Sequence, residues 1–374
     1  MGGGAAMSET LEALIEQWDG LGVVASYHAE TGSWIFIALH DDTLGRPTGG
    51  CRLKTYATPA EGLRDAMRLA EGMTWKWAAM GFGYGGGKSV LAVPGPMRGE
   101  ARRSLLTRFG QILNGLGGAY RVGEDLGTTP RDMAFLAGVT NSVAGCSAGI
   151  EAGGHAADPG PFTAAGVHEG ILAALAHIDG TGDMNGRAVL VQGAGDVGGP
   201  LARLLGRSGA RVLVCDLDAA LARTVAEECG GAVVESRAVY ETPCDVYAPC
   251  AIGATVNRRT IPVLRCRIVA GSANNQLETA EDAQRLRARG ILYAPDYVIN
   301  GGGAMAFGLM ESGISDPGEL ERRVRSIGGT LTRIFRDADD RGIAPTEAAR
   351  ALALETLAEG PRDVEIQETG DAGR

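Results

Sequence analysis

The feature that most constrains the fold is a regular alternation of short apolar strands and helical patterns between residues 186 and 300. This alternation is typical of a parallel sheet with helices on both faces. The strands are continuous apolar runs, as burial on both faces requires. We expect six of them: Ala188–Gln192, Arg211–Cys215, Ala232–Val234, Asp245–Ala248, Arg267–Ala270 and Ile291–Tyr293.

A glycine motif follows the first of these strands and opens a helix. It consists of Gly193, Ala194, Gly195, Asp196, Val197 and Gly198. Since the next strand ends at Asp216, the order matches the dinucleotide fingerprint of a Rossmann domain. The glycines let a pyrophosphate approach the helix N-terminus, and Asp216 would accept hydrogen bonds from the adenosine ribose. A carboxylate there repels a 2′-phosphate, so the motif favours NAD over NADP. The alternative is a glycine-rich turn without a ligand.

The first part of the chain, from about residue 8 to 146, mixes strands and helices without regular alternation. Its short β-branched and aromatic runs predict strands at Val23–His28, Trp34–His40, Cys51–Tyr56, Lys88–Val93 and Tyr120–Val122. Ser142–Pro161 is rich in Gly, Ala and Pro and is the expected linker to a long helix over Thr163–Ile178. We therefore expect two α/β domains.

Composition excludes several classes of protein. The net charge is −10, and no stripe of Lys and Arg indicates a nucleic-acid partner. No apolar run approaches the roughly 18 residues that span a membrane. The seven cysteines lack metal-site spacing, so we expect reduced thiols, no metal site and a cytoplasmic location. The N-terminus does not resemble a signal peptide, and either Met1 or Met7 could be the start.

Lysine occurs only three times, as Lys54, Lys76 and Lys88. Lys76 and Lys88 flank a glycine-rich segment that superficially resembles a phosphate-binding loop, but Phe82 stands where that loop needs glycine. A lysine crowded by a second cation and apolar groups has a depressed pKa and can act as a base, which suits an amino-acid site. The alternative is two solvated surface lysines, although arginine supplies every other basic side chain.

Two further polar motifs stand at predicted strand ends. Asp125, in the segment Glu124–Thr129, is either a catalytic carboxylate or the N-cap of the next helix. Asn274 and Asn275 follow a Rossmann strand, at the edge where ligands bind. They suit recognition of nicotinamide or a carboxylate, or they form an Asx turn.

Together these motifs resemble the leucine, phenylalanine and valine dehydrogenases of the glutamate dehydrogenase superfamily. The resemblance runs in family order from about residue 35 to 310. Its segments begin with Gly49-Gly50-Cys51-Arg52, Gly72-Met73-Thr74-Trp75-Lys76, Gly85-Gly86-Gly87-Lys88 and Glu124-Asp125-Leu126-Gly127. They continue with Gly193–Gly198, Cys244–Ala251, Gly271–Leu277 and Tyr293–Asn300.

The resemblance implies reversible, NAD-dependent oxidative deamination of an L-amino acid to its 2-oxo acid and ammonia. It implies that Lys76 binds the substrate carboxylate, that Lys88 is the general base, and that Asp125 exchanges protons with the amine. The backbone at Gly49 and Gly50 would lie under the substrate. Thr163, Asn274 and Asn275 would lie at the nicotinamide and carboxylate end.

The resemblance also implies an architecture. A substrate-binding and oligomerisation domain would occupy residues 1–146, and a Rossmann domain would occupy residues 147–334, with a cleft between them. Helices from about 335 to 374 would pack back on the first domain. The enzyme would be a homo-oligomer, either a dimer or an octamer.

Pocket positions depart from the family pattern. Thr48 replaces an apolar residue, Gly123 stands where alanine is common, and Ala304 takes the place of the valine usual in leucine- and valine-specific members. Smaller walls favour a bulkier, aromatic substrate, although Phe307 could refill some of the space. No lysine stands at these positions to bind a γ-carboxylate, which disfavours glutamate.

Three alternatives stay open. A 2-hydroxy acid dehydrogenase would use a histidine, but all five histidines lie outside the motifs. A biosynthetic dehydrogenase could make an unusual amino acid from its oxo acid. A non-catalytic paralogue could bind NAD or an amino acid, although the chain retains Lys76, Lys88 and Asp125 together.

Overall fold

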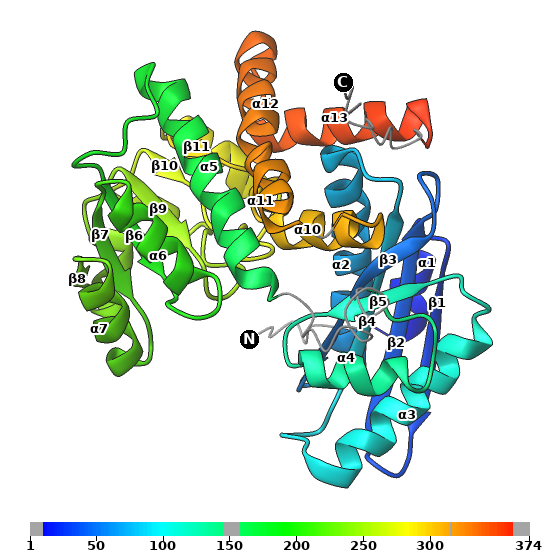
Figure 1. The fold of residues 1–374 in the computed structure, drawn as a ribbon. Helices are drawn as coiled ribbons and strands as arrows, with labels where there is room; N and C mark the ends of the chain where they lie inside the picture. The colour runs from blue at the N-terminus through cyan, green and yellow to red at the C-terminus, as the bar shows by residue number, and fades with distance from the viewer. Residues whose placement is uncertain (1–9, 145–157, 315, 362–374) are drawn as a thin grey trace, which may run out of the picture. The chain divides into compact units, whose positions relative to one another are not determined.

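The computed structural model describes residues 10–144, 158–314 and 316–361. The chain divides into two compact units, each described here by itself (Figure 1). Unit 1 comprises Met1–Cys146 and Leu354–Arg374, and unit 2 comprises Ser147–Ala353. No helix of the described residues is long and apolar enough to span a membrane.

Unit 1 contains a five-stranded sheet in the order β1-β2-β4-β3-β5. The strands are β1 (Gly22–His28), β2 (Ser33–Asp41), β3 (Pro47–Lys54), β4 (Gly85–Ala92) and β5 (Arg121–Glu124). β3 runs parallel to both β4 and β5, whereas β2 is antiparallel to β1 and β4. All five expected strands are present, but β3 and β4 begin several residues earlier than predicted because glycines occupy their first halves.

Helices cover both faces of this sheet (Figure 1). They are α1 (Leu11–Glu16), α2 (Pro59–Met80), α3 (Gly99–Gly115) and α4 (Pro130–Ala137). α2 packs on the face that carries Phe36, Ala38 and Val90, while α3 and α4 pack on the face that carries Cys51 and Leu91. Because strand side chains alternate between faces, Lys88 shares the α2 face with Val90. By the same alternation, Gly50 and Arg52 lie on that face, opposite Cys51.

Unit 2 contains a six-stranded parallel sheet in the order β11-β10-β9-β6-β7-β8. This is the doubly wound strand order of a Rossmann domain, with a switch point between β6 and β9. The strands are β6 (Ala188–Gln192), β7 (Arg211–Cys215), β8 (Ala232–Val233), β9 (Val246–Pro249), β10 (Ile268–Val269) and β11 (Leu292–Tyr293). The expected fold class, two α/β domains of which the second is Rossmann-like, is confirmed.

The helices of unit 2 begin with a long one after the expected linker. They are α5 (Pro159–Asp179), α6 (Gly198–Arg207), α7 (Ala219–Glu228), α8 (Glu281–Ala288), α9 (Asp296–Ile299), α10 (Gly302–Glu311), α11 (Pro317–Arg325) and α12 (Ile327–Arg341), with short 3₁₀ turns at Ser236–Glu241 and Ile261–Val263. The last helix, α13 (Pro345–Glu359), begins in unit 2 and continues past Leu354 into unit 1. Most of the expected linker, residues 145–157, lies outside the described residues. At its two ends, Val143 bridges to Val122 beside β5, and α5 begins at Pro159.

The chain returns to unit 1 at Leu354. Within unit 2, α12 packs against α5. Gly166 and Gly170 on α5 have no side chains, and a Cβ there would lie 2.8 Å from side-chain atoms of Ile327 and Leu331, respectively. The two helices therefore approach closely, and α12 belongs to the Rossmann unit.

Candidate active site

An ion pair joins two strands of unit 1 that are not neighbours. Lys88 lies on β4, and Asp125 directly follows β5; the Lys88 Nζ is 3.2 Å from Asp125 Oδ2. Both side chains are largely buried, with exposed fractions of 6% and 17%. The two residues that the sequence analysis assigned to proton transfer are therefore brought together.

Glycine on the intervening strand makes this contact possible. In the register of the sheet, Gly50 of β3 pairs with Gly123 of β5, and β3 also pairs with β4. A Cβ on Gly50 would lie 2.7 Å from Asp125 Cβ and 3.1 Å from Lys88 Nζ. Any larger residue would thus occupy the space through which the lysine reaches the carboxylate.

A second cation, Arg52, binds the same carboxylate oxygen. Its Nε donates to Asp125 Oδ2 over 2.9 Å, and its terminal nitrogen donates to Asp65 Oδ2 on α2 over 3.0 Å. The Tyr56 hydroxyl also donates to Asp65 Oδ2, over 2.6 Å. Sequence reasoning quoted Arg52 within a family segment but gave it no role. The signal was its spacing, since it lies two residues after Gly50 and hence on the same face.

The electrostatics follow from this burial and pairing. Burial lowers the pKa of Lys88 below its ordinary value, and the Arg52 charge lowers it further, while Asp125 opposes the change. Burial by itself would raise the pKa of Asp125, but Lys88 and Arg52 outweigh it and hold that pKa at about 2. A lysine with a depressed pKa can accept a proton near working pH, and the carboxylate stays ionised.

The structure decides between the two interpretations of Asp125. The N-cap of α4 is Thr129, whose hydroxyl accepts from Asp132 N, while the Asp132 carboxylate accepts from Thr129 N. This capping box leaves Asp125 outside the helix terminus. The N-cap interpretation is therefore wrong, and the carboxylate faces the two cations instead.

The remaining predicted residues of unit 1 lie where α2 meets β3. Trp77 Nε1 donates to the carbonyl of Thr48 over 3.0 Å, and the Thr48 hydroxyl donates to the carbonyl of Arg46. Thr48 is buried, and this hydrogen bond gives its hydroxyl a partner inside the protein. Lys76, which neighbours Trp77 in sequence, is a partly buried residue of α2. Gly49 packs tightly, since a Cβ there would lie 1.9 Å from the carbonyl oxygen of Gly87.

In unit 2 the fingerprint loop lies at the switch point of the sheet. Gly193 has a φ of +98°, and a Cβ on it would lie 2.8 Å from Ala251 Cβ just after β9. By contrast, the space beside Gly195 is open, with no atom within 4 Å of a Cβ placed there. No side chain caps the N-terminus of α6. Open space and uncapped amides at a helix N-terminus fit a pyrophosphate.

Asp216, directly after β7, holds this loop in place. Its Oδ2 accepts from Ala194 N over 2.7 Å, and its Oδ1 accepts from Asp218 N over 2.9 Å. Each carboxylate oxygen has a second lone pair, so the group can still accept from a ribose hydroxyl. The loop residues Asp196 and Val197 lie between the glycines that form the turn.

A second group of predicted residues in unit 2 lies around the start of α10. The Thr163 hydroxyl accepts from Gly303 N over 3.1 Å, which fixes the start of α10 beside α5. Asn300 Nδ2 donates to Asn274 Oδ1 over 2.7 Å. Asn300 was quoted in a family segment without a role, and it is a further residue that sequence reasoning missed. The helix α10 then carries Ala304 and Phe307, both partly buried.

Asn275 differs from its neighbour. Its φ is +52°, a left-handed conformation that asparagine tolerates, and its carbonyl accepts from Ala254 N over 2.7 Å. The backbone here is therefore a tight turn, while the Asn274 side-chain oxygen accepts from the Asn300 amide.

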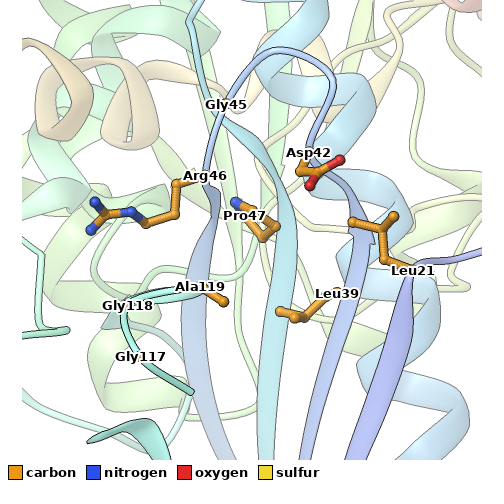
Figure 2. A pocket seen from close by; sticks show the side chains of 9 residues that line it. All are labelled: Leu21, Leu39, Asp42, Gly45, Arg46, Pro47, Gly117, Gly118 and Ala119. Carbon is orange, nitrogen blue, oxygen red and sulfur yellow. The ribbon is translucent and has the colours of Figure 1, made fainter. Parts of the chain in front are cut away.

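A pocket of about 400 Å³ lies elsewhere in unit 1, at the amino end of β3 (Figure 2). Leu21, Leu39 and Pro47 form its apolar floor, and Figure 2 shows Arg46 and Asp42 on opposite sides. None of the predicted site residues lines it. Within the described ranges, no group of His, Cys, Asp and Glu residues is arranged to hold a metal ion.

Two family models match parts of this chain. The family model "Glu/Leu/Phe/Val dehydrogenase, dimerisation domain" matches residues 29–142, and "Glutamate/Leucine/Phenylalanine/Valine dehydrogenase" matches residues 218–359. The chain belongs to this family. A leucine dehydrogenase of Bacillus cereus is 39% identical over 344 residues, which cover 92% of each chain.

Aromatic-specific relatives are nearly as similar to this family member. A phenylalanine dehydrogenase of Bacillus thermotolerans is 36% identical over 347 residues, covering 91% of this chain and 89% of the relative. The crystal structure of L-tryptophan dehydrogenase from Nostoc punctiforme has a TM-score of 0.76 at 34% identity, covering 93% of this chain and 99% of that one. The chain is thus an amino acid dehydrogenase, an oxidoreductase, in a family of pyridine-nucleotide-dependent dehydrogenases.

Proposed function

We propose that this enzyme converts an L-amino acid with a large hydrophobic side chain to its 2-oxo acid and ammonia, reversibly and with NAD. The observation that carries the reaction is the buried Lys88–Asp125 pair at 3.2 Å, a base beside an ionised carboxylate. The observation that carries the cofactor is the Asp216 carboxylate bound to the fingerprint loop at Ala194 N.

The preference for NAD follows from charge. Asp216 is anchored by two backbone amides, so its position at the end of β7 is fixed. A fixed carboxylate attracts ribose hydroxyls and repels a 2′-phosphate, which carries negative charge itself. Gly193, Gly195 and Gly198 would hold the pyrophosphate, and Thr163 with Asn274 would serve the nicotinamide end.

When bound, the nicotinamide supplies one piece of chemistry, acceptance of a hydride from the substrate α-carbon. The chain's own residues do the rest. Lys76 would bind the α-carboxylate over the backbone of Gly49 and Gly50. Lys88 Nζ, whose pKa is lowered by burial, would take a proton from the attacking water. Asp125 would exchange a proton with the amine, and Asn275 would lie by the carboxylate.

The substrate side chain is inferred from the small residues of the pocket. Gly123 and Ala304 are smaller than the alanine and the valine that the resemblance leads us to expect at these two positions, and the Thr48 hydroxyl donates to the carbonyl of Arg46. We therefore favour an aromatic substrate, with Phe307 as the residue that limits the space. One methylene changes binding in such pockets by about 1–3 kcal/mol, enough to change the rank of substrates.

We also propose the setting in which the enzyme works. The family model that matches residues 29–142 describes a dimerisation domain, which supports a homo-oligomer, a dimer or an octamer. The six cysteines of the described residues are all free thiols, which is typical of the reducing cytoplasm. We propose that the substrate-binding domain of this chain ends at about residue 146 and that its Rossmann domain ends at about residue 334.

The test is an absorbance assay of NADH formation at alkaline pH with Phe, Trp, Tyr, Leu, Ile, Val, Met and Glu, using NAD and NADP separately. We expect NAD to be preferred and an aromatic amino acid to give the highest kcat/KM. A preference for Leu or Val would contradict the enlarged pocket. Failure of all eight, with NAD binding intact, would favour a specialised biosynthetic substrate or a non-catalytic role.

A further inference from the structure

We propose that Arg52 is a positioning residue of the active site, which orients the Asp125 carboxylate and acts on Lys88 through the oxygen that both cations share. The inference rests on the proposed function of Lys88 and Asp125. It assigns a role to a side chain outside the proton-transfer pair and links that pair to helix α2.

The first argument is that Arg52 is itself held rigidly. Its exposed fraction is 11%, and it bridges Asp125 after β5 and Asp65 on α2. Asp65 is fixed in turn by the Tyr56 hydroxyl at 2.6 Å. A guanidinium has several donors in one plane, so a single side chain can satisfy two carboxylates at once, which a lysine ammonium does with less directional control.

The second argument concerns which oxygen is occupied. Among the described residues, only Arg52 and Lys88 donate to the Asp125 carboxylate, at 2.9 and 3.2 Å, and both contact Oδ2. Oδ1 is therefore the oxygen left for the substrate amine. If Arg52 were absent, the carboxylate could rotate about its Cβ–Cγ bond and present either oxygen to Lys88.

The third argument is electrostatic. Burial lowers the pKa of Lys88, and repulsion by the Arg52 charge lowers it further. Burial raises the pKa of Asp125, but Lys88 and Arg52 together outweigh burial and lower that pKa. The other titratable or charged groups that act on this cluster include Asp65 and Tyr56 on the α2 side, and Cys51, Tyr120 and Asp132 on the far side of the sheet. Arg52 is the cation among them that opposes a proton on Lys88.

The test uses the scarcity of lysine. Because the chain has only three lysines, protein labelled with carbon-13 at the lysine ε position gives three signals that can each be titrated. Lys88→Met identifies the Lys88 signal by its loss. We expect Arg52→Gln to raise the Lys88 titration midpoint by roughly one pH unit or more, because a repelling charge is removed. The alkaline rise of kcat/KM should move with it.

Two further variants separate charge from geometry. Arg52→Lys keeps the charge, so the Lys88 midpoint should stay near that of the wild type, whereas kcat should fall roughly 10- to 100-fold because the carboxylate is no longer aligned. Arg68→Gln is the matched control. Arg68 also lies near Asp65, at 3.8 Å, but is half-exposed and does not contact Asp125. It should change neither the midpoint nor kcat.

The proposal is overturned if folded Arg52→Gln leaves both the Lys88 midpoint and the pH profile unchanged, or if Arg52→Lys retains full kcat. If Arg52→Gln does not fold, the Arg52→Lys variant alone decides the positioning role. The lysine titration needs no substrate. A wild-type enzyme that fails to deaminate any amino acid would therefore contradict the proposed function, while the midpoint would still test the action of Arg52 on Lys88.

Discussion

Lys88 reaches Asp125 across a strand that carries glycine at the crossing point. The lysine is on β4 and the carboxylate follows β5, yet their charged atoms are 3.2 Å apart because Gly50 of β3 has no side chain between them. Parallel pairing of all three strands fixes this geometry. The ion pair thus depends on the pairing of these strands, with Asp125 one residue beyond the end of β5.

Removal of the Lys88 side chain should greatly reduce catalysis while NADH binding is retained. We expect Lys88→Ala to lower kcat for deamination by roughly 10²- to 10⁴-fold, the usual contribution of a general base, while NADH still binds to unit 2. Steady-state assays and a fluorescence titration with NADH measure the two effects. Lys54→Ala is the control, since Lys54 is exposed and lies over the Tyr56 ring. Near-normal turnover by Lys88→Ala would refute the assignment of the base.

A methyl group at the crossing point should have a similar effect. In Gly50→Ala the new Cβ would lie 2.7 Å from both Asp125 Cβ and the carbonyl of Glu124, so the strands must shift. We expect a loss of stability of about 1–3 kcal/mol and at least a tenfold fall in kcat. Gly115→Ala is the matched control, because a Cβ there has no neighbour within 4 Å. Denaturant unfolding measures the loss of stability, and steady-state kinetics measures the fall in kcat. An unchanged kcat would contradict the idea that the space at Gly50 is needed for the Lys88–Asp125 contact.

The ion pair also predicts a pH dependence of stability. The pKa of Asp125 is about 2 in the folded chain, below the roughly 3.9 of an unfolded aspartate. Its contribution is therefore complete above about pH 4 and is lost as the pH falls towards 2. Between pH 5 and 3 the wild type should lose on the order of 1 kcal/mol more than a variant that lacks this titration.

The suitable comparison is the double variant Lys88→Met/Asp125→Asn, because Asp125→Asn alone would leave a buried ammonium without its anion. Arg52 keeps Asp65 as a partner in that variant. The free energy of unfolding at pH 5, 4 and 3 gives the difference. Parallel curves for the two proteins would show that Asp125 titrates normally.

Much of the architecture could be predicted from local sequence. In unit 2, β6 and β7 have the bounds expected from their apolar runs, and the fingerprint glycines are where the strand–turn–helix order placed them. Strong period and turn signals act over short distances, so they survive without tertiary information. The resemblance to the amino acid dehydrogenases is confirmed for the same reason, since its motifs are local.

The structural features that could not be predicted from the sequence depend on contacts between distant segments. Glycines at the start of β3 and β4 resemble loop residues, and only the packing of Trp77 and Gly87 against them shows that they form strands. Arg52 has no local signal for its two carboxylate partners, which lie 13 and 73 residues away. The close approach of α12 to the glycines of α5 is likewise a tertiary effect, with no local signal in the sequence.

The charge of Asp216 should set the choice between the two nucleotides. Asp216→Asn keeps an oxygen that can accept from Ala194 N, which lies 2.7 Å away, so the fingerprint loop should stay in place. The repulsion of a 2′-phosphate is lost, however. We expect NADPH to bind at least tenfold more tightly to this variant than to the wild type, since a nearby unit charge commonly contributes about 1.4 kcal/mol or more, while NADH binding weakens only a few-fold.

Asp218→Asn, which removes the N-cap charge of α7 two residues later, is the matched control and should leave the ratio of affinities unchanged. Fluorescence titrations with both nucleotides measure this ratio directly. If Asp216→Asn and Asp218→Asn discriminate equally well against NADPH, the preference for NAD does not arise from the carboxylate at the end of β7.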